Sequence, residues 1–297
     1  MAEAGVPELE ALIKTKTGQN RALQTSIFLG LGLLSIVFIL PLFWMVSTSL
    51  KPIEETMKLP PTFIPSEWKW GNYAEALTRI PFFLYLKNTL IVVVLGTLGT
   101  VLSSSLVAYG FAHLRWPGRD TFFWLTLGTM MVPFPVLMVP LYSVFKELHW
   151  IGTLAPLWAP AWFGGAWNIF LMRQFFMGLP RELFEAARVD GASYFRMFRS
   201  VAVPLTLPAL IVVFIFELKA SWTDLMKPLI FIKDLDLFTL PLGLKSLVDA
   251  FNPQTGGQGE FHLVMAASVI ITMPMVVIFF LAQRYFVEGI ATTGSKG

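Results

Sequence analysis

Residues that could carry out chemistry are sparse in this 297-residue chain. Its three histidines, His113, His149 and His262, are scattered, and none has a second histidine at the spacing that holds zinc on a helix. Cysteine is absent, which excludes a disulfide, a thiolate metal site and a cysteine nucleophile. The G-x-S-x-G turn of the α/β-hydrolases is also missing. We therefore predict no catalytic residue and no metal site.

A loop that could cradle nucleotide phosphates is missing as well. The pattern G-x-x-x-x-G-K-[ST] requires a Gly-Lys pair, and the chain contains none. We predict that the chain binds no cofactor and is not an enzyme by itself. If ATP drives this protein, the ATP must be hydrolysed by another polypeptide.

Ionisable residues inside apolar segments would indicate ion-coupled transport. The deepest candidates are Glu217 and Lys219, which follow Pro204 by about 20 Å along a helix that rises about 1.5 Å per residue. That distance places them toward the far end of the segment rather than at its middle. Residues two apart do not face each other on a helix. We expect Glu217 to be paired or to lie near the membrane interface, and contact with a transport pathway is the alternative.

A compact polar stretch, residues 179–208, interrupts the apolar sequence and reads "LPRELFEAARVDGASYFRMFRSVAVPLTLP". Pro180 suits the first turn of a helix, and Glu182 would lie near its positive end. Gly191 offers the left-handed conformation that ends helices, and a second short helix would span residues 193–200. The pattern predicts a helix–turn–helix outside the membrane.

Two uses of this polar helix remain open from the residues alone. Leu183, Ala186 and Ala187 recur at helical spacing and share a face, and the two alanines would let another backbone approach. Glu185 would offer an acid to a basic partner. Alternatively, the helix lies on the membrane surface, with its phenylalanines in the interface and its arginines against anionic lipid. The three phenylalanines are Phe184, Phe195 and Phe198.

The elements that position this stretch are predicted to be membrane helices. The chain is 55% hydrophobic and 14% charged, whereas soluble domains carry about a quarter charged residues. Six apolar blocks are each close to or above the roughly 20 residues that span a bilayer. These blocks are residues 23–50, 85–111, 122–145, 154–176, 201–222 and 262–286. The first block is too long for the hydrophobic region of a signal peptide, about 7–15 residues. We predict an all-α polytopic membrane protein with six transmembrane helices.

Basic residues suggest the orientation of these helices. The short links 113–121 and 177–200 carry Arg115, Arg119, Arg181, Arg188, Arg196 and Arg199. Because short cytoplasmic loops are enriched in Lys and Arg, we predict that both termini and the polar stretch are cytoplasmic. The domains are then a cytoplasmic segment over 1–22, a transmembrane domain over 23–290 and a cytoplasmic tail over 291–297. The role of the long outer loop 223–261 stays open.

The polar stretch resembles the EAA loop of the membrane subunits of binding-protein-dependent ABC importers. The match consists of Glu185, Ala186, Ala187, Asp190, Gly191 and Ala192, with Pro204 at the closing proline. Further stretches are similar to the carbohydrate-type permeases, on the side of the maltose-type second permease subunit. They are "SLKPIEE", "NYAEAL", "KNTLIVV", "YGFAHLRWPGRD", "VPLYSVFKELHWIGT", "LMRQFF" and "QRYFVEGIATTGSKG". The resemblance implies the type I ABC importer permease fold with a cytoplasmic coupling helix.

In that family the EAA helix docks on an ATPase subunit. The resemblance therefore implies a docking surface made of Glu185, Ala186, Ala187, Asp190 and Gly191, with the tail 291–297 reaching toward the ATPase pair. The implied partners are a second homologous permease, two cytoplasmic ATPase subunits, an extracytoplasmic solute-binding protein and membrane lipid. The net charge of +3 gives no indication of nucleic acid.

The implied function is import of a sugar or oligosaccharide across a bacterial or archaeal inner membrane by alternating access. An ABC permease for another solute is the first alternative. An ion-coupled secondary transporter is a second, and it would need an internal repeat and charged midplane sites. A membrane enzyme is a third, and it would need a polar catalytic cluster. The sequence identifies no residue that contacts the solute.

Overall fold

A computed structural model describes the backbone of residues 6–251 and 259–294, and the side chains of residues 23–251 and 259–283. Every regular element in these residues is a helix. In chain order the longer helices are α1 (Val6–Ser49), α3 (Gly71–Arg79), α4 (Phe82–His113), α5 (Arg119–Thr129), α6 (Phe134–Glu147), α8 (Ala166–Met177), α9 (Arg181–Val189), α12 (Leu207–Trp222), α14 (Leu240–Phe251) and α15 (Phe261–Gly294). The short ones are α2 (Ile53–Thr56), α7 (Ala155–Trp158), η1 (Ala159–Phe163), α10 (Tyr194–Met197), the π-helical turn η2 (Phe198–Ala202), α11 (Val203–Leu205), α13 (Met226–Phe231) and η3 (Leu235–Leu237).

The predicted all-α membrane class is confirmed, but the count of six continuous spans is not. Over the described residues, three helical stretches are long and apolar enough to cross a membrane: Leu23–Ser49, Phe82–His113 and Phe261–Gln283. Two bent pairs raise the number to five if each pair is one span. One pair, α5 with α6, bends by 101°, and the other, Tyr194–Leu205 with Leu207–Trp222, bends by 81°.

The predicted fourth span, residues 154–176, is broken in the structure. It consists of α7, the short η1 and then α8, with a break at Gly164 and Gly165. Gly164 has a φ of +82°, a backbone angle that side chains other than that of glycine rarely accept. Proline residues Pro156 and Pro160 at the starts of α7 and η1 remove backbone donors, so a continuous helix cannot run through them without loss.

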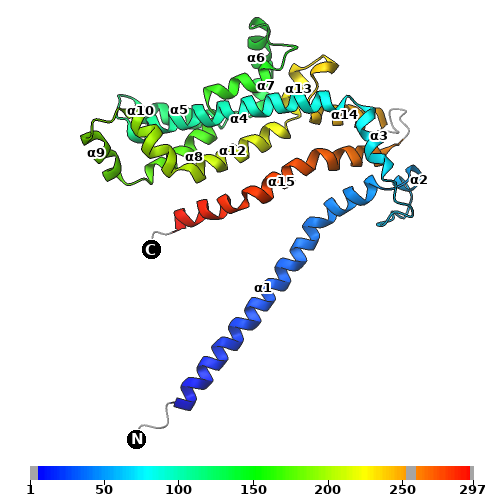
Figure 1. Cartoon of the computed structure of the whole chain (residues 1–297), viewed down its shortest axis with the longest axis horizontal. Coiled ribbons are helices and arrows are strands. Elements are labelled where there is room, and N and C mark those ends of the chain that lie inside the picture. The colour runs from blue at the N-terminus through cyan, green and yellow to red at the C-terminus, as the bar shows by residue number, and fades with distance from the viewer. Residues whose placement is uncertain (1–5, 252–258, 295–297) are drawn as a thin grey trace.

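Helix α4 is the central element of the body, and α8, η1 and α12 pack along it (Figure 1). A core of buried residues joins these helices around Ala108, Met172, Phe176 and Val213. A β-carbon added at Gly99 of α4 would lie only 2.5 Å from the Trp162 ring. The close approach of η1 to α4 therefore requires glycine at this position.

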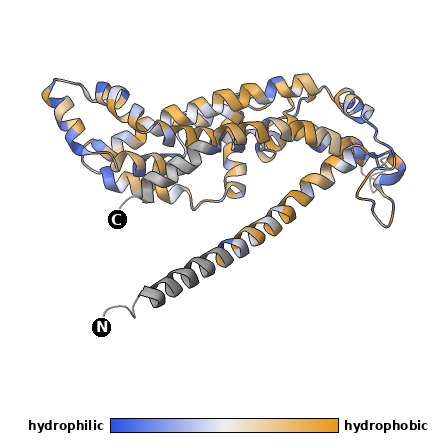
Figure 2. Cartoon of the chain, turned by 60° about the horizontal axis from the view of Figure 1, so that its bottom comes forward, coloured by the Kyte–Doolittle hydropathy of each residue, from blue (hydrophilic) through white to orange (hydrophobic). Residues whose placement is uncertain are grey.

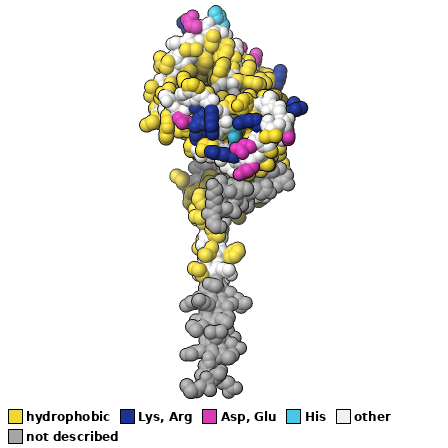
Figure 3. Space-filling model, turned by 90° about the vertical axis from the view of Figure 1, so that its left-hand side faces the viewer, with side chains coloured by type: hydrophobic (Ala, Val, Ile, Leu, Met, Phe, Trp, Pro, Cys, Tyr) yellow, Lys and Arg dark blue, Asp and Glu magenta, His cyan; other side chains and the backbone are white. Residues whose placement is uncertain are grey.

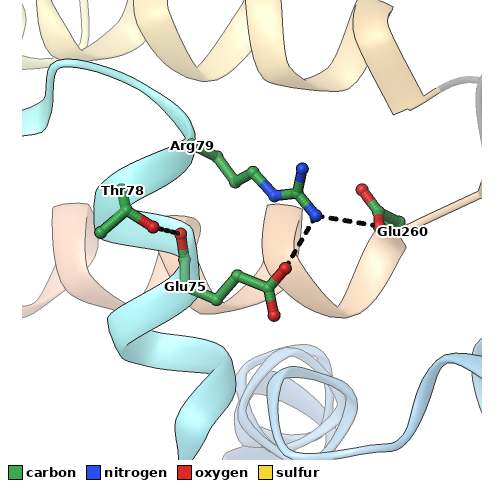
Figure 4. Close-up of polar contacts among 4 residues, drawn as sticks. All are labelled: Glu75, Thr78, Arg79 and Glu260. Carbon is green, nitrogen blue, oxygen red and sulfur yellow. Dashed lines mark hydrogen bonds and ion pairs between the residues drawn. The ribbon is translucent and has the colours of Figure 1, made fainter.

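A second core closes the opposite end of the body, where α3, α14 and the start of α15 meet. Figure 4 shows the polar contact that accompanies it: Nη2 of Arg79 donates to Glu75 at 2.7 Å and to Glu260 at 3.3 Å. Glu260 precedes α15, so Arg79 links α3 to the beginning of the last helix.

Helix α1 extends away from the body over most of its length (Figure 1). Its described part is mainly hydrophobic (Figure 2), and its large apolar side chains between Leu23 and Phe43 are exposed. Only its end is anchored. The Ser49 hydroxyl lies 2.8 Å from the Tyr73 hydroxyl, and Nζ of the buried Lys51 donates to the Thr62 carbonyl at 2.6 Å.

Candidate functional site at the α9 end of the body

Helix α9 contains the polar motif, and its ends are formed as the sequence predicts. Pro180 precedes the first turn, and Gly191 follows the last with a φ of +76°. Two hydrogen bonds close the C-terminus: Gly191 N–H donates to the Arg188 carbonyl at 3.0 Å, and Ala192 N–H donates to the Ala187 carbonyl at 2.9 Å. This is the Schellman arrangement, which satisfies the last carbonyls of the helix. Helix α9 therefore has a fixed length and a fixed exit direction.

One buried aromatic ring holds α9 on the body. Phe184 is only 6% exposed, and its ring stacks on the His113 imidazole at the end of α4, with centroids 4.0 Å apart. Leu183, which was expected to share a face with Ala186 and Ala187, is 43% exposed, while Ala187 packs against the core. Phe184 and Ala187 therefore form the inward face of α9. They share this face because residues three apart are neighbours on a helix surface.

The outward face of α9 carries most of the predicted docking residues. Glu185, Ala186, Asp190 and Gly191 are exposed, and no atom lies within 4 Å of a β-carbon built on Gly191. Val189, which sequence reasoning missed, is 88% exposed beside them. Its position three residues after Ala186 and four after Glu185 was the available signal. The exposed face thus combines two acids, two small residues and the apolar Val189.

The three phenylalanines of the membrane-surface interpretation do not behave alike. Phe184 and Phe198 are buried in the protein core, and Phe195 is 65% exposed. Two of the three are therefore used to attach this region to the rest of the protein, and only Phe195 is free to meet lipid.

Positive charge gathers at this end of the molecule (Figure 3). A cavity of about 300 Å³ is lined by residues of α9, the end of α4 and the start of α5. Its charged lining consists of Arg115, Arg119, Arg181, Glu185 and Arg188. Such a surface can hold acidic groups of a partner.

The segment after α9 leads back into the membrane body. The Ser193 hydroxyl accepts from Arg196 N–H at 3.3 Å and begins α10, which continues through η2 and α11. The chain then bends by 81° into α12. The predicted second short helix is present, although its later part is a π-helical turn.

The three histidines and Glu217 lie in different parts of the chain. His113 packs on Phe184, His149 ends the turn after α6, and His262 is buried at the start of α15. Among the described residues, no group of three histidines or carboxylates could hold a metal ion. Glu217 is half-buried in α12, where it accepts from the Asn168 amide of α8 at 3.3 Å, and no described basic residue forms an ion pair with it.

The fold and this site define a helical membrane subunit that presents a short polar helix on one face. Residues 99–292 match the family described as binding-protein-dependent transport system inner membrane component. The chain belongs to this family, so the predicted membership is confirmed.

Relatives extend the match to most of the chain. The arabinooligosaccharides transport system permease protein AraQ of Halalkalibacterium halodurans is 30% identical over 272 residues, covering 91% of this chain and 95% of that protein. The sn-glycerol-3-phosphate transport system permease protein UgpE of Pectobacterium atrosepticum is 32% identical over 270 residues, covering 89% and 94%.

A solved structure supports the fold. One chain of a bacterial ABC transporter involved in the import of the acidic polysaccharide alginate matches with a TM-score of 0.78 at 21% identity. The match covers 90% of this chain and 98% of that one. The predicted type I permease architecture is confirmed.

Proposed function

We propose that the chain is a permease subunit of an ATP-driven importer and forms part of the pathway for a sugar or oligosaccharide. The substrate class is supported by the arabinooligosaccharide transport named in two relatives that are 30–31% identical. The chain performs no catalysis, and separate ATPase subunits drive it by alternating access.

The observation that carries this proposal is the construction of α9. Its inner side is fixed to α4 by Phe184, while Glu185, Ala186, Val189, Asp190 and Gly191 face outward. A helix that is rigidly attached and exposed on one side is suited to carry motion from a docked ATPase into α4. Coupling requires that docking differ between the inward- and outward-facing states, because only differential binding shifts an equilibrium.

The orientation follows from this assignment. We place the α9 end and both termini in the cytoplasm of the cell, in its inner membrane. Helix α15 runs toward the α9 end (Figure 1) and continues to Gly294. The proposed tail contact with the ATPase pair involves residues 291–297, of which 295–297 lie outside the described part of the chain.

The opposite end and α1 would meet the other partners. The end that holds α2, α3 and the start of α15 would face the extracytoplasmic solute-binding protein. A second homologous permease would complete the pathway. The position of α1 supports a second permease. Most of the described part of α1 has no packing partner in this chain, and helices in membranes associate through packing, so a neighbouring subunit would supply the missing contacts.

Reconstitution tests the proposal directly. The chain, its second permease, its ATPase subunits and its binding protein would be placed in liposomes with labelled arabinotriose, maltotriose and glycerol 3-phosphate. We expect ATP-dependent uptake of a sugar, abolished by an inactive ATPase subunit. Uptake by this chain alone on an ion gradient would instead favour a secondary transporter, and absence of any ATP-driven uptake would contradict the proposal.

A further inference from the structure

Glu217 opens onto a cavity at the break in the predicted fourth span. The cavity measures about 230 Å³, and its polar lining includes Glu217 of α12 and Lys227 of α13. Aromatic and apolar walls come from Phe134, Phe145 and Phe231. A few polar groups in an apolar hollow are typical of sites for small organic ligands.

The broken helix helps to create this hollow. The Ser104 hydroxyl of α4 accepts from Gly165 N–H at 3.2 Å. The Ser103 hydroxyl donates to the Gly99 carbonyl of its own helix at 2.6 Å, and its oxygen lies 3.2 Å from the Ala161 carbonyl. The Ser104 side chain thus satisfies a backbone group at the break, where a lipid-exposed chain could not remain irregular. The break that borders the hollow is therefore held to α4 by a hydrogen bond.

The Glu217 carboxylate has acceptor capacity left for a ligand. Its Oε2 accepts from Asn168 Nδ2 at 3.3 Å, and its Oε1 lies 3.5 Å from the Ser221 hydroxyl. A carboxylate has about four lone-pair sites, so these two long contacts leave room for further donors. An ionisable group that is retained within an apolar span without a charged partner indicates a functional site.

The charge in this region disfavours an acidic ligand. The Lys227 ammonium is already paired with Asp224, Nζ to Oδ2 at 3.1 Å. Among the described charged residues that line the cavity, Glu217 is therefore the one without an ionic partner. A phosphate or uronate would be repelled by it, whereas the hydroxyl groups of a neutral sugar would donate to it.

We propose that the Glu217 cavity is a subsite for one unit of a neutral, polyhydroxylated solute, with Glu217 accepting hydrogen bonds from its hydroxyl groups. This inference rests on the proposed import function and specifies its substrate class. Whole ligand pockets measure roughly 300–1,000 Å³, so the smaller volume fits one sugar unit, with the remainder held by the second permease.

Binding to the purified transporter complex, without its binding protein, tests the inference. Labelled arabinotriose and maltotriose would be titrated, with glycerol 3-phosphate and an alginate trisaccharide as acidic competitors. We expect the complex to bind a neutral sugar and Glu217→Gln to weaken that binding about tenfold, since the variant loses a charged acceptor. The acidic solutes should compete poorly with the wild type and better with Glu217→Gln.

Matched variants separate recognition from structure. Glu147→Gln makes the same chemical change at an exposed position at the end of α6 and should bind as the wild type does. Glu217→Asp keeps the charge but shortens the reach, so it should weaken neutral binding while still excluding acidic solutes. If Glu217→Gln fails to assemble, this aspartate variant decides the question.

The outcomes are distinct for the two proposals. Unchanged sugar affinity in Glu217→Asp or Glu217→Gln, or preference of the wild type for an acidic solute, overturns the subsite and leaves the import function standing. Absence of ATP-driven uptake by the reconstituted wild type overturns the import function, and the subsite fails with it.

Discussion

The His113 imidazole and the Phe184 ring stack with centroids 4.0 Å apart and an interplanar angle of 29°. Because His113 is the last residue of α4 and Phe184 lies in the middle of α9, this contact joins the central helix of the body to the proposed docking helix. Tyr109, one turn earlier in α4, contacts the same ring at 6.4 Å. We therefore expect α9 and the end of α4 to move together.

Phe184→Ala should release α9 from the body. Truncating a buried phenylalanine costs about 3–5 kcal/mol in well-packed cores, so α9 would no longer hold a fixed position. We expect ATP-driven uptake to fall at least about tenfold while the chain still inserts into the membrane. The measurements are uptake by reconstituted complexes and the amount of membrane-integrated protein. Phe195→Ala is the control, since Phe195 is 65% exposed, and equal uptake by both variants would contradict the anchoring role.

Gly191→Trp should abolish uptake without preventing insertion. No atom crowds a β-carbon at Gly191, so the cost comes from its φ of +76° and from bulk projecting onto the docking face. A side chain in this left-handed region costs about 1–2 kcal/mol. Gly191→Asn is the control, because asparagine accepts this conformation more readily. Normal ATP-driven uptake by the tryptophan variant would refute the docking assignment.

Val189→Asp should weaken binding of the ATPase subunits. Val189 is 88% exposed on the outward face. An aspartate there would become an unpaired charge on docking, and burying an unsatisfied polar group costs about 1–3 kcal/mol or more. We expect the dissociation constant for the ATPase subunits to rise about tenfold in a pull-down or surface-binding assay. Leu235→Asp, which changes a 63% exposed leucine in η3, should leave it unchanged. Loss of binding in both variants would indicate a general defect.

Lys51→Met should destabilise the anchored end of α1, near Ser49. The Lys51 ammonium donates to the Thr62 carbonyl at 2.6 Å and lies 4.0 Å from the centre of the Trp44 ring. A hydrogen bond from a charged group contributes about 1.5–3 kcal/mol, so we expect a lower melting temperature for the purified complex. Lys58→Met, at an exposed position of the same loop, should have no such effect.

The same lysine gives a pH dependence with a defined sign. Burial lowers the pKa of Lys51 below its ordinary 10.5, and the nearby Glu55 carboxylate raises it by less. At a pH between the folded-state pKa of Lys51 and its ordinary pKa, the unfolded chain binds more protons than the folded chain. The stability of the folded protein therefore rises with pH in this range. The stability gained from losing the Lys51 proton is complete above pH 10.5, and it is lost as the pH falls through the folded-state pKa of Lys51. The melting-temperature difference between wild type and Lys51→Met should grow toward alkaline pH, and a shrinking difference would contradict this account.

Local signals in the sequence predicted much of the site. Helix α9 begins after Pro180 and ends before Gly191, as expected. Helix ends can be predicted from sequence because they depend on the backbone preferences of individual residues. The all-helical membrane class followed equally well from the apolar blocks, since a bilayer demands long apolar helices. Glu185 and Ala186, which the motif placed on the proposed docking surface, are exposed.

Other features depend on residues that are distant in the chain. Choosing Phe184 over Leu183 as the anchor required the position of His113, about seventy residues earlier, and no periodicity within α9 specifies it. The break at Gly164 and the meeting of Glu217 with Asn168 depend likewise on packing between α4, α8 and α12. The sequence by itself determined which segments are apolar, where α9 begins and ends, and which family the chain belongs to. Only the tertiary structure decided which spans bend or break and which side chains meet across them, because those outcomes depend on contacts between helices and not on the preferences of any one helix.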